Sequence, residues 1–275
     1  MRFVDVSSIP TLPYPELREV LARFVSDISA ELGDNLVGIY MVGSLAIGDF
    51  DLDSDVDFLV ITKHELSEPN TRHLPQIMTG IQQMGSYPAN HLEGSFIPLA
   101  DLGDWQSVGS KDYFYFDNGS TELEKTTHDN QWHVRWVLRE RGITLVGPAP
   151  QTFVQPVPAS EIANEMRVGM IRNVKEFGDE IEHPRCFWNS RFGQSFAVLT
   201  QCRKLQTLKT GTVHSKKAAA AWAKGVVEPR WVPLIDQAWQ EREGVRFMEK
   251  IRQRADQALL DETLEFIKYT VSLIE

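Results

Sequence analysis

A polar loop between two apolar runs restricts the folds open to this chain more than any other feature. The run 36–42 predicts a buried strand that stops at Gly43-Ser44, and the run 56–61 predicts a second strand that pairs with it. The loop between them, residues 43–55, is rich in aspartate. We therefore expect two adjacent strands with a polar, acidic connection.

Asp55 and Asp57 are the candidate metal ligands in this stretch. Residues two apart on a strand point to the same face, about 7 Å from each other. Two carboxylates so placed repel each other unless a cation lies between them, and oxygen ligands together with a phosphate-bearing substrate suit Mg²⁺. The alternative is a solvated acidic loop without a ligand.

Gly43 and Ser44 are the candidate phosphate-binding residues. A glycine turn that leaves a strand and opens a short helix presents backbone N–H groups and a serine hydroxyl to a phosphate chain. The stretch 43–57 therefore predicts a site for a phosphate-bearing substrate and a divalent cation.

The charge balance argues against a polyanionic partner. The 275 residues include 28 Lys and Arg against 38 Asp and Glu, a net charge of −10. Nucleic-acid binding draws on a basic stripe, whereas an acidic cleft attracts a cationic small molecule. We expect a cationic small-molecule acceptor as a partner, and no nucleic acid.

Other global features predict a cytoplasmic protein. Residues 1–12 lack the cationic start and long apolar stretch of an export signal, and no window approaches 18 uninterrupted apolar residues. The chain has two cysteines, Cys186 and Cys202, too few for a disulfide framework, and we expect both to be reduced. We also expect a monomer with no membrane contact.

The chain order predicts an α+β fold with two domains. An N-terminal helix ending at Gly33 precedes the two central strands. A polar stretch and an amphipathic segment at 77–84 follow, then strands at 91–99 and 113–116, and a helix that includes Trp132 and Ile143. This part predicts a mixed sheet with flanking helices, the first domain, residues 1–156.

A cluster of prolines separates this part from an all-helical remainder. Pro148, Pro150, Pro156 and Pro158 read as an interdomain connection. Beyond it, helical patterns cover 159–178, 190–210, 215–224, 229–243 and 245–273. We expect a helical bundle, the second domain, residues 157–275.

Glu93 is the candidate third carboxylate. It lies in the predicted strand 91–99, which can project an acid toward the same metals as Asp55 and Asp57. A carboxylate near a metal and an acceptor hydroxyl can take the hydroxyl proton. The alternative is an exposed glutamate at a strand edge.

Several motifs together carry a resemblance to a known family. Gly43-Ser44 followed by Ser54-Asp55-Val56-Asp57 resembles the signature of the nucleotidyltransferase superfamily. Further along, Leu199-Thr200-Gln201-Cys202-Arg203 and Ala219-Ala220-Ala221-Trp222-Ala223 resemble the helical domain of aminoglycoside 3''-adenylyltransferases, the streptomycin and spectinomycin resistance enzymes. The resemblance spans nearly the whole chain.

The resemblance implies roles for individual residues. It places the triphosphate of ATP on Gly43, Ser44 and Ser54, and on Arg203 and Lys216 of the helical domain. It makes Asp55, Asp57 and Glu93 the Mg²⁺-binding and catalytic carboxylates, with Glu93 as general base. The implied reaction is transfer of AMP from ATP to a hydroxyl of an aminoglycoside-type antibiotic, with release of pyrophosphate.

One departure from the family bears on the acceptor. Streptomycin-modifying relatives have a tryptophan and acids just before the helix that leads to the arginine, where this chain has Trp188-Asn189-Ser190-Arg191 and Gly193. We therefore expect spectinomycin in preference to streptomycin. Two alternatives stay open: an acceptor hydroxyl on another metabolite or on a protein, or a catalytically silent nucleotide-binding regulator.

Overall fold

The chain folds into two compact units, Met1–Val157 and Pro158–Glu275, which we call the first and the second unit. The computed structural model describes residues 14–51, 53–183, 186–242 and 252–274. Two segments interpreted above from sequence, residues 1–13 and 245–251, lie outside this range. No described helix has the length and apolar character needed to cross a bilayer.

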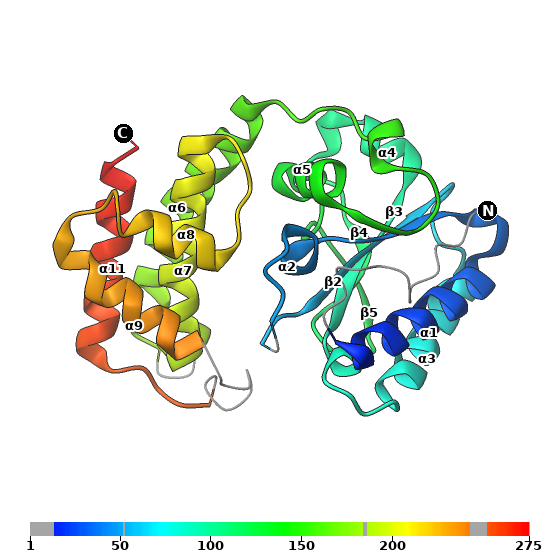
Figure 1. The fold of residues 1–275 in the computed structure, drawn as a ribbon, viewed down its shortest axis with the longest axis horizontal. Coiled ribbons are helices and arrows are strands. Elements are labelled where there is room, and N and C mark those ends of the chain that lie inside the picture. The colour runs from blue at the N-terminus through cyan, green and yellow to red at the C-terminus, as the bar shows by residue number, and fades with distance from the viewer. Residues whose placement is uncertain (1–13, 52, 184–185, 243–251, 275) are drawn as a thin grey trace. The chain divides into compact units, whose positions relative to one another are not determined.

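A six-stranded mixed sheet forms the centre of the first unit (Figure 1). The strand order is β5-β4-β3-β2-β1-β6. The strands are β1 (Leu36–Met41), β2 (Val56–Thr62), β3 (Leu92–Pro98), β4 (Tyr113–Phe116), β5 (Leu123–Thr126) and β6 (Ile143–Val146). β2 and β3 run parallel, and every other neighbouring pair is antiparallel. The mixed sheet confirms the predicted α+β class and the four predicted strands.

Helices cover this sheet because their apolar faces match its buried residues. The helices of the first unit are α1 (Pro15–Leu32), α2 (Gly43–Ile47), α3 (Glu68–Gln82), α4 (Leu99–Gly103) and α5 (Trp132–Arg141), with single 3-10 turns at Gly33–Asn35, Pro88–Asn90, Trp105–Ser107 and Pro150–Thr152. Figure 1 shows α1 and α3 side by side. Phe24 of α1 packs against Phe58 of β2, with ring centroids 4.6 Å apart.

The end of α5 differs from the prediction. The helix expected to include Ile143 ends at Arg141, and Ile143 begins β6, where it pairs with Met41 of β1. The backbone of Gly142 closes the helix by donating to the Leu138 carbonyl. An apolar residue directly after a helix fits either pattern, and the free edge of β1 decides the outcome.

The start of α3 and the strand β5 also differ. α3 begins at Glu68, well before the predicted 77–84, because Ser67 and Asn70 form a reciprocal capping box. Pro75 lies inside the helix and lacks the backbone N–H of other residues. The helix tolerates this because Leu74 and Met78 on either side of it are buried. β5 was not predicted, since Leu123 is its one apolar residue.

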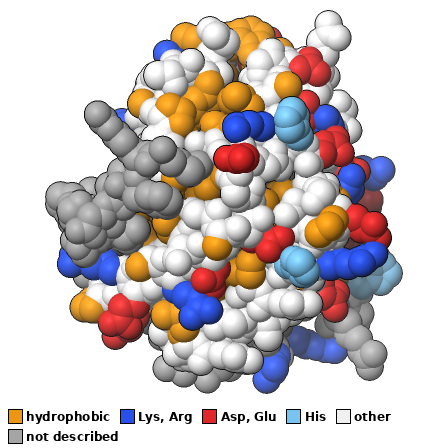
Figure 2. Space-filling view, turned by 90° about the vertical axis from the view of Figure 1, so that its right-hand side faces the viewer, with side chains coloured by type: hydrophobic (Ala, Val, Ile, Leu, Met, Phe, Trp, Pro, Cys, Tyr) orange, Lys and Arg blue, Asp and Glu red, His pale blue; other side chains and the backbone are white. Residues whose placement is uncertain are grey.

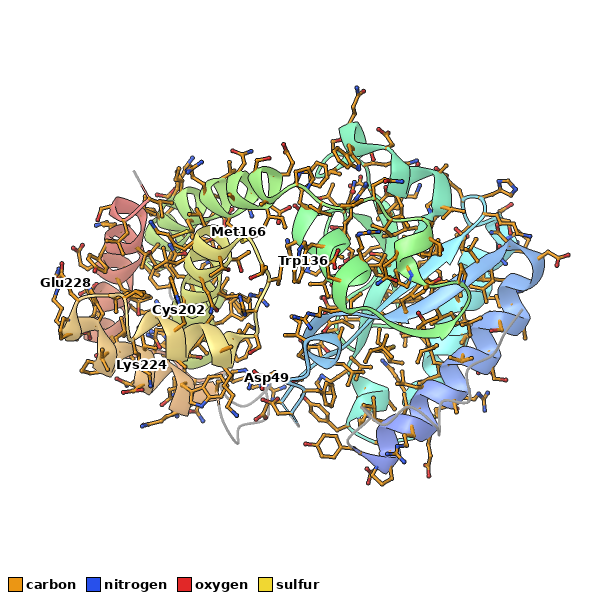
Figure 3. The ribbon with its side chains drawn as sticks, turned by 45° about the horizontal axis from the view of Figure 1, so that its top comes forward. Asp49, Trp136, Met166, Cys202, Lys224 and Glu228 are labelled. Atoms are coloured by element: carbon orange, nitrogen blue, oxygen red, sulfur yellow. The ribbon has the colours of Figure 1, made fainter. Side chains whose placement is uncertain are left out.

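The second unit is all-helical as predicted. Its helices are α6 (Ala159–Glu180), α7 (Arg191–Thr210), α8 (Lys216–Ala223), α9 (Val232–Arg242) and α11 (Gln257–Ser272), with single 3-10 turns at Phe187–Asn189 and Pro229–Trp231. α7 is the central helix, in contact with α6, α8, α9 and α11. Figure 3 shows Cys202 of α7 among these helices, and its thiol is fully buried and free.

The last helix begins later than predicted. Residues 252–256 are not helical, and α11 starts after Asp256, whose carboxylate accepts hydrogen bonds from the backbone of Ala258 and Leu259. Arg254 instead forms an isolated bridge with Ser190. A continuous helical pattern in the sequence can therefore contain a break, at the residue that caps the next helix.

Two buried amide–hydroxyl pairs join α7 to α11. Gln194 Nε2 donates to Thr263 Oγ1 at 2.7 Å, and Gln201 Nε2 donates to Thr270 Oγ1 at 2.8 Å. All four residues are at most 1% exposed. Both pairs advance by seven residues, so the two helices run in the same direction.

Candidate active site

The turn between β1 and α2 brings the backbone against Asp57. Gly43 has a φ of +56°, and a Cβ atom on it would lie 1.8 Å from Asp57 Oδ2. The neighbouring backbone N–H of Val42 donates to the Asp57 carbonyl at 3.0 Å. A residue at position 43 must therefore be glycine, both for the backbone conformation and for the close approach of a carboxylate.

The two serines of the signature have different surroundings. Ser44 is the second residue of α2, and its buried Oγ has no hydrogen-bond partner among the described residues. Ser54 is 3% exposed; its Oγ donates to Asp51 Oδ1 at 2.8 Å and accepts from the Asp51 backbone at 3.1 Å. The Ser44 hydroxyl thus makes no hydrogen bond to the described residues, whereas Ser54 fixes the loop that leads into Asp55.

Strand register brings the three carboxylates together. Asp57 of β2 lies opposite Glu93 of β3 in the parallel pair, and Asp55 directly precedes β2. The pKa of Glu93 is raised to about 7, mainly by burial; a hydrogen bond from Tyr115 opposes the shift, and the charge of Asp55 adds to it. Glu93, with a side chain 13% exposed, is therefore not the exposed strand-edge glutamate of the alternative.

Tyr115 and His128 contact Glu93, and sequence reasoning assigned neither to the site. The Tyr115 hydroxyl donates to Glu93 Oε1 at 2.5 Å, and His128 Nε2 lies 3.8 Å from the same oxygen. The hydrogen bond with Asp129 is the main cause that raises the pKa of His128 to about 9. Asp129 also accepts from Ser95 Oγ at 2.7 Å. Glu93, the candidate base, is thus contacted by polar side chains that are hydrogen-bonded in turn to their own neighbours.

Asn118 is a third neighbour that the sequence did not reveal. Its Nδ2 donates to Asp55 Oδ1 at 2.5 Å, and its Oδ1 lies 2.9 Å from His91 Nδ1. The sequence 117–119 predicts a tight turn, but only the pairing of β3 with β4 places that turn beside Asp55. The available signal was an Asp-Asn-Gly turn directly after a strand next to β3.

The carboxylates do not form a ready-made metal cage. Among the described residues, no three His, Cys, Asp or Glu side chains stand close enough to hold an ion by themselves. Asp55, Asp57 and Glu93 nonetheless interact electrostatically with one another or with shared neighbours. The donor set is oxygen only, which is the chemistry that Mg²⁺ accepts.

The other two predicted nucleotide ligands lie in the second unit. Arg203 is on α7 and is half-buried. Lys216 is the first residue of α8, after Ser215, whose Oγ caps the helix by accepting from Ala218 at 3.0 Å. The Lys216 ammonium lies 4.5 Å from the ring centroid of Phe196. The predicted cap is confirmed, and each cation has a defined place on a helix.

The segment where streptomycin-modifying relatives carry acids is taken up by local structure. Asn189 Nδ2 donates to the Ile181 carbonyl at 2.8 Å, and Ser190 caps α7. Arg191 forms a bidentate pair with Glu241. A Cβ atom on Gly193 would lie 2.1 Å from the Phe187 carbonyl oxygen. An acidic side chain at position 193 would require the backbone to shift.

Trp188 packs within the second unit. Its ring lies 5.0 Å from that of Phe187 and 5.9 Å from that of Phe177. The side chain belongs to a hydrophobic cluster with Phe177 and Leu260. This packing accounts for the tryptophan without a ligand.

Comparisons with known proteins match both units. Residues 21–136 match the family described as "Nucleotidyltransferase domain", and residues 152–270 match "Aminoglycoside adenylyltransferase, C-terminal domain". Together the two models match both parts of an aminoglycoside adenylyltransferase. They support an ATP-dependent nucleotidyltransferase and confirm the resemblance drawn from the sequence motifs.

Members of this family with named activities align over most of the chain. Spectinomycin 9-adenylyltransferase of Staphylococcus aureus is 27% identical over 237 residues, which is 82% of this chain and 82% of that protein. The Campylobacter jejuni enzyme of the same name is 24% identical, over 90% of this chain and 98% of its own. Aminoglycoside (3'')(9) adenylyltransferase of Escherichia coli is 23% identical, over 94% and 96%.

A solved structure shares the fold. The crystal structure of spectinomycin adenyltransferase from Enterococcus faecialis, with ATP and spectinomycin, superposes with a TM-score of 0.66 at 14% identity. The match covers 92% of this chain and 98% of that one. It confirms the family fold over nearly the full length.

Proposed function

We propose that this protein transfers AMP from ATP to a hydroxyl of spectinomycin, releasing pyrophosphate. The observation that carries the proposal is the pairing of Asp57 with Glu93 across β2 and β3, beside Gly43 and Ser44. This arrangement places an acid near two further carboxylates and next to a turn suited to phosphates. The choice of spectinomycin as the acceptor comes from the names of the relatives.

The nucleotide is bound through its phosphates. Ser44 supplies the hydroxyl, because its buried Oγ has no partner among the described residues. Gly43 keeps the backbone close to Asp57, and Ser54 acts by holding the loop before Asp55. From the family pattern, Arg203 and Lys216 bind the triphosphate as cations. Their roles rest on motif position.

Asp55, Asp57 and Glu93 are the residues that would hold Mg²⁺ together with ATP. Mg²⁺ binds through one or two carboxylates, substrate phosphates and several waters, so three preassembled side-chain ligands are not required. These neighbouring carboxylates fit such an ion, since they offer oxygen ligands and the charge of Asp55 raises the pKa of Glu93, as expected of like charges held close together. When bound, the ion neutralises charge on the phosphates of ATP.

Glu93 takes the proton of the acceptor hydroxyl. The hydroxyl oxygen bonds to the α-phosphorus of ATP, and the bond from that phosphorus to the bridging oxygen breaks, so that pyrophosphate leaves with the electron pair. A carboxylate with a pKa of about 7 accepts a proton more readily near neutral pH than an ordinary glutamate. Tyr115 holds its Oε1 in place.

Spectinomycin is preferred over streptomycin because of the segment 188–193. A net charge of −10 favours a cationic acceptor of either kind. The segment 188–193, however, has no acid, its polar groups are committed to local contacts, and Gly193 leaves no room for a side chain. The family feature associated with streptomycin is therefore missing.

We further propose a cytoplasmic monomer that does not act on nucleic acid. On the face drawn in Figure 2, acidic and basic side chains of the described residues are interspersed and form no continuous basic stripe. Nucleic-acid binding needs such a stripe. The buried, reduced Cys202 fits a reducing compartment.

The test is pyrophosphate release from MgATP by the purified protein with spectinomycin, with streptomycin and with no acceptor. We expect release that depends on spectinomycin. Glu93→Gln should lower turnover about 100-fold or more while ATP binding persists. Glu124→Gln, on the exposed face of β5, is the matched control.

Two results would contradict the proposal in different ways. If neither drug causes pyrophosphate release despite Mg-dependent ATP binding, spectinomycin is refuted as the acceptor. The remaining possibilities are then an acceptor hydroxyl on another molecule or a regulatory role. Unchanged turnover in Glu93→Gln would refute Glu93 as the base.

A further inference from the structure

The turn after β4 presents an amide to Asp55. Asn118 Nδ2 donates to Asp55 Oδ1 at 2.5 Å across a sequence separation of 63 residues. A carboxylate oxygen only accepts, so the nitrogen of the amide must face it. The other end of the same amide, Oδ1, lies 2.9 Å from His91 Nδ1. The orientation of Asn118 is therefore determined by its two neighbours.

The turn that carries Asn118 is itself anchored. The backbone N–H of Gly119 donates to the Leu92 carbonyl at 3.2 Å, and Ser120 N–H donates to the Asp117 carbonyl at 2.7 Å. Gln82 of α3 donates to the Gly119 carbonyl. The amide of Asn118 thus has a fixed place relative to the first residue of β3, one position before Glu93.

His91 supports the amide from the other side. Since Asn118 Oδ1 accepts, Nδ1 of His91 is the protonated ring nitrogen. The ring stacks on Tyr87, with centroids 4.0 Å apart and planes 24° apart, which limits its rotation. The same Nδ1 lies 4.0 Å from Asp55 Oδ1. The chain Tyr87, His91, Asn118 leads to one oxygen of Asp55.

We propose that Asn118 is a positioning residue that holds the Asp55 carboxylate in the orientation needed to bind the divalent cation of MgATP. The inference rests on the proposed function, in which Asp55 is a cation ligand. A neutral amide suits this task because it engages Oδ1 without neutralising the charge that the cation requires. The carboxylate would otherwise turn away from the like charge of Glu93.

The experiment compares Asn118→Ala with Asn90→Ala. Asn90 is exposed, lies in the 3-10 turn Pro88–Asn90, and its side chain donates only to the Ser86 carbonyl among the bonds described. Pyrophosphate release with spectinomycin is measured over a range of Mg²⁺ concentrations. Cation binding is measured separately with Mn²⁺ and ATP, from the loss of the free Mn²⁺ resonance signal.

We expect Asn118→Ala to raise the half-saturating Mg²⁺ concentration and the Mn²⁺ dissociation constant about tenfold or more, the scale for loss of a residue that orients a metal ligand. The KM for spectinomycin should stay within about twofold, because the substitution acts on cation binding and leaves the acceptor hydroxyl's own contacts in place. Asn90→Ala should match the unsubstituted protein in every measurement. A merely structural role would lower the melting temperature and leave cation affinity unchanged.

Asp55→Asn and the double variant separate the role of Asn118 from the role of Asp55. If Asn118 acts through Asp55, adding Asn118→Ala to Asp55→Asn changes cation affinity no further. Unchanged cation affinity in Asn118→Ala, alongside a loss in Asp55→Asn, would overturn the inference alone. Unchanged cation affinity in Asp55→Asn would instead overturn the proposed role of Asp55.

Discussion

Asp57 and Glu93 in the first unit are placed by the register of two strands, whereas Arg203 and Lys216 in the second unit are long side chains on helices. The first pair is fixed by backbone pairing and by short hydrogen bonds from neighbours such as Tyr115. Lys216 rests over the ring of Phe196. Because of this difference, we expect substitutions at the strand-fixed residues of the first unit to cause large losses of activity. Substitutions of the long side chains in the second unit should cause smaller losses.

The largest effect should come from Gly43→Ala. The added methyl group would collide with Asp57 Oδ2, and the positive φ would be strained as well. We expect pyrophosphate release to fall by about 100-fold or more, since small displacements of reacting groups have effects of that size. Gly80→Ala in α3, where a Cβ atom meets nothing within 4 Å, is the control. Retention of more than a tenth of the activity in Gly43→Ala would show that position 43 does not require glycine.

A second effect concerns stability and pH. The folded-state pKa of Glu93 is about 7, above its ordinary value of 4.5, so the folded state gains protons relative to the unfolded chain between these values. Its favourable contribution is present below pH 4.5 and is lost as pH rises through 7. Glu93→Gln lacks this loss. Without nucleotide, the free energy of unfolding of Glu93→Gln, relative to that of the unsubstituted protein, should therefore be higher at pH 8 than at pH 5 by on the order of 2 kcal/mol.

Urea unfolding at the two pH values measures this change. Glu124→Gln on β5 should show the same difference from the unsubstituted protein at both. A stability change for Glu93→Gln that does not vary with pH would show that burial does not govern the ionisation of Glu93.

A smaller effect is expected from Lys216→Met, which keeps the apolar stem of the side chain and removes the charge. The KM for ATP should rise about tenfold, the value of one charge-assisted hydrogen bond of about 1.5 kcal/mol. Lys217→Met, at the exposed next position of α8, is the matched control. Equal KM values for the two variants would remove Lys216 from the nucleotide site.

The smallest effect should follow from Phe196→Leu. A cation over an aromatic ring contributes about 0.5 kcal/mol at an exposed site, so the KM for ATP should rise about twofold. In a Lys216→Met background the same substitution should change nothing further. An effect that persists there would assign Phe196 a role of its own.

The sequence predicted the central strands and the acidic loop because their signals are local. The apolar runs around 43–57 and the capping serine before Lys216 each need only a few neighbouring residues to be recognised. The failures had a different origin. Ile143 was assigned to a helix because its partner, Met41, lies about a hundred positions earlier in the chain.

The same reason explains which site residues were missed. The hydrogen bond from Asn118 to Asp55 exists only because Gly94 pairs with Phe116, which sets the turn beside the loop. His128 reaches Glu93 from a segment after the unpredicted strand β5. Residue types can be recognised from motifs, whereas contacts made across the sheet depend on pairings that no single stretch encodes.

The amide–hydroxyl pairs between α7 and α11 limit how Arg203 can move. Arg203 follows two residues after Gln201, whose amide is bonded to Thr270 in a fully buried position. Sliding α7 along α11 by one turn would separate both buried amides from their threonine partners, a cost of several kcal/mol. When a nucleotide arrives, Arg203 can therefore respond by rotating its side chain, or by travelling with both helices as one rigid body.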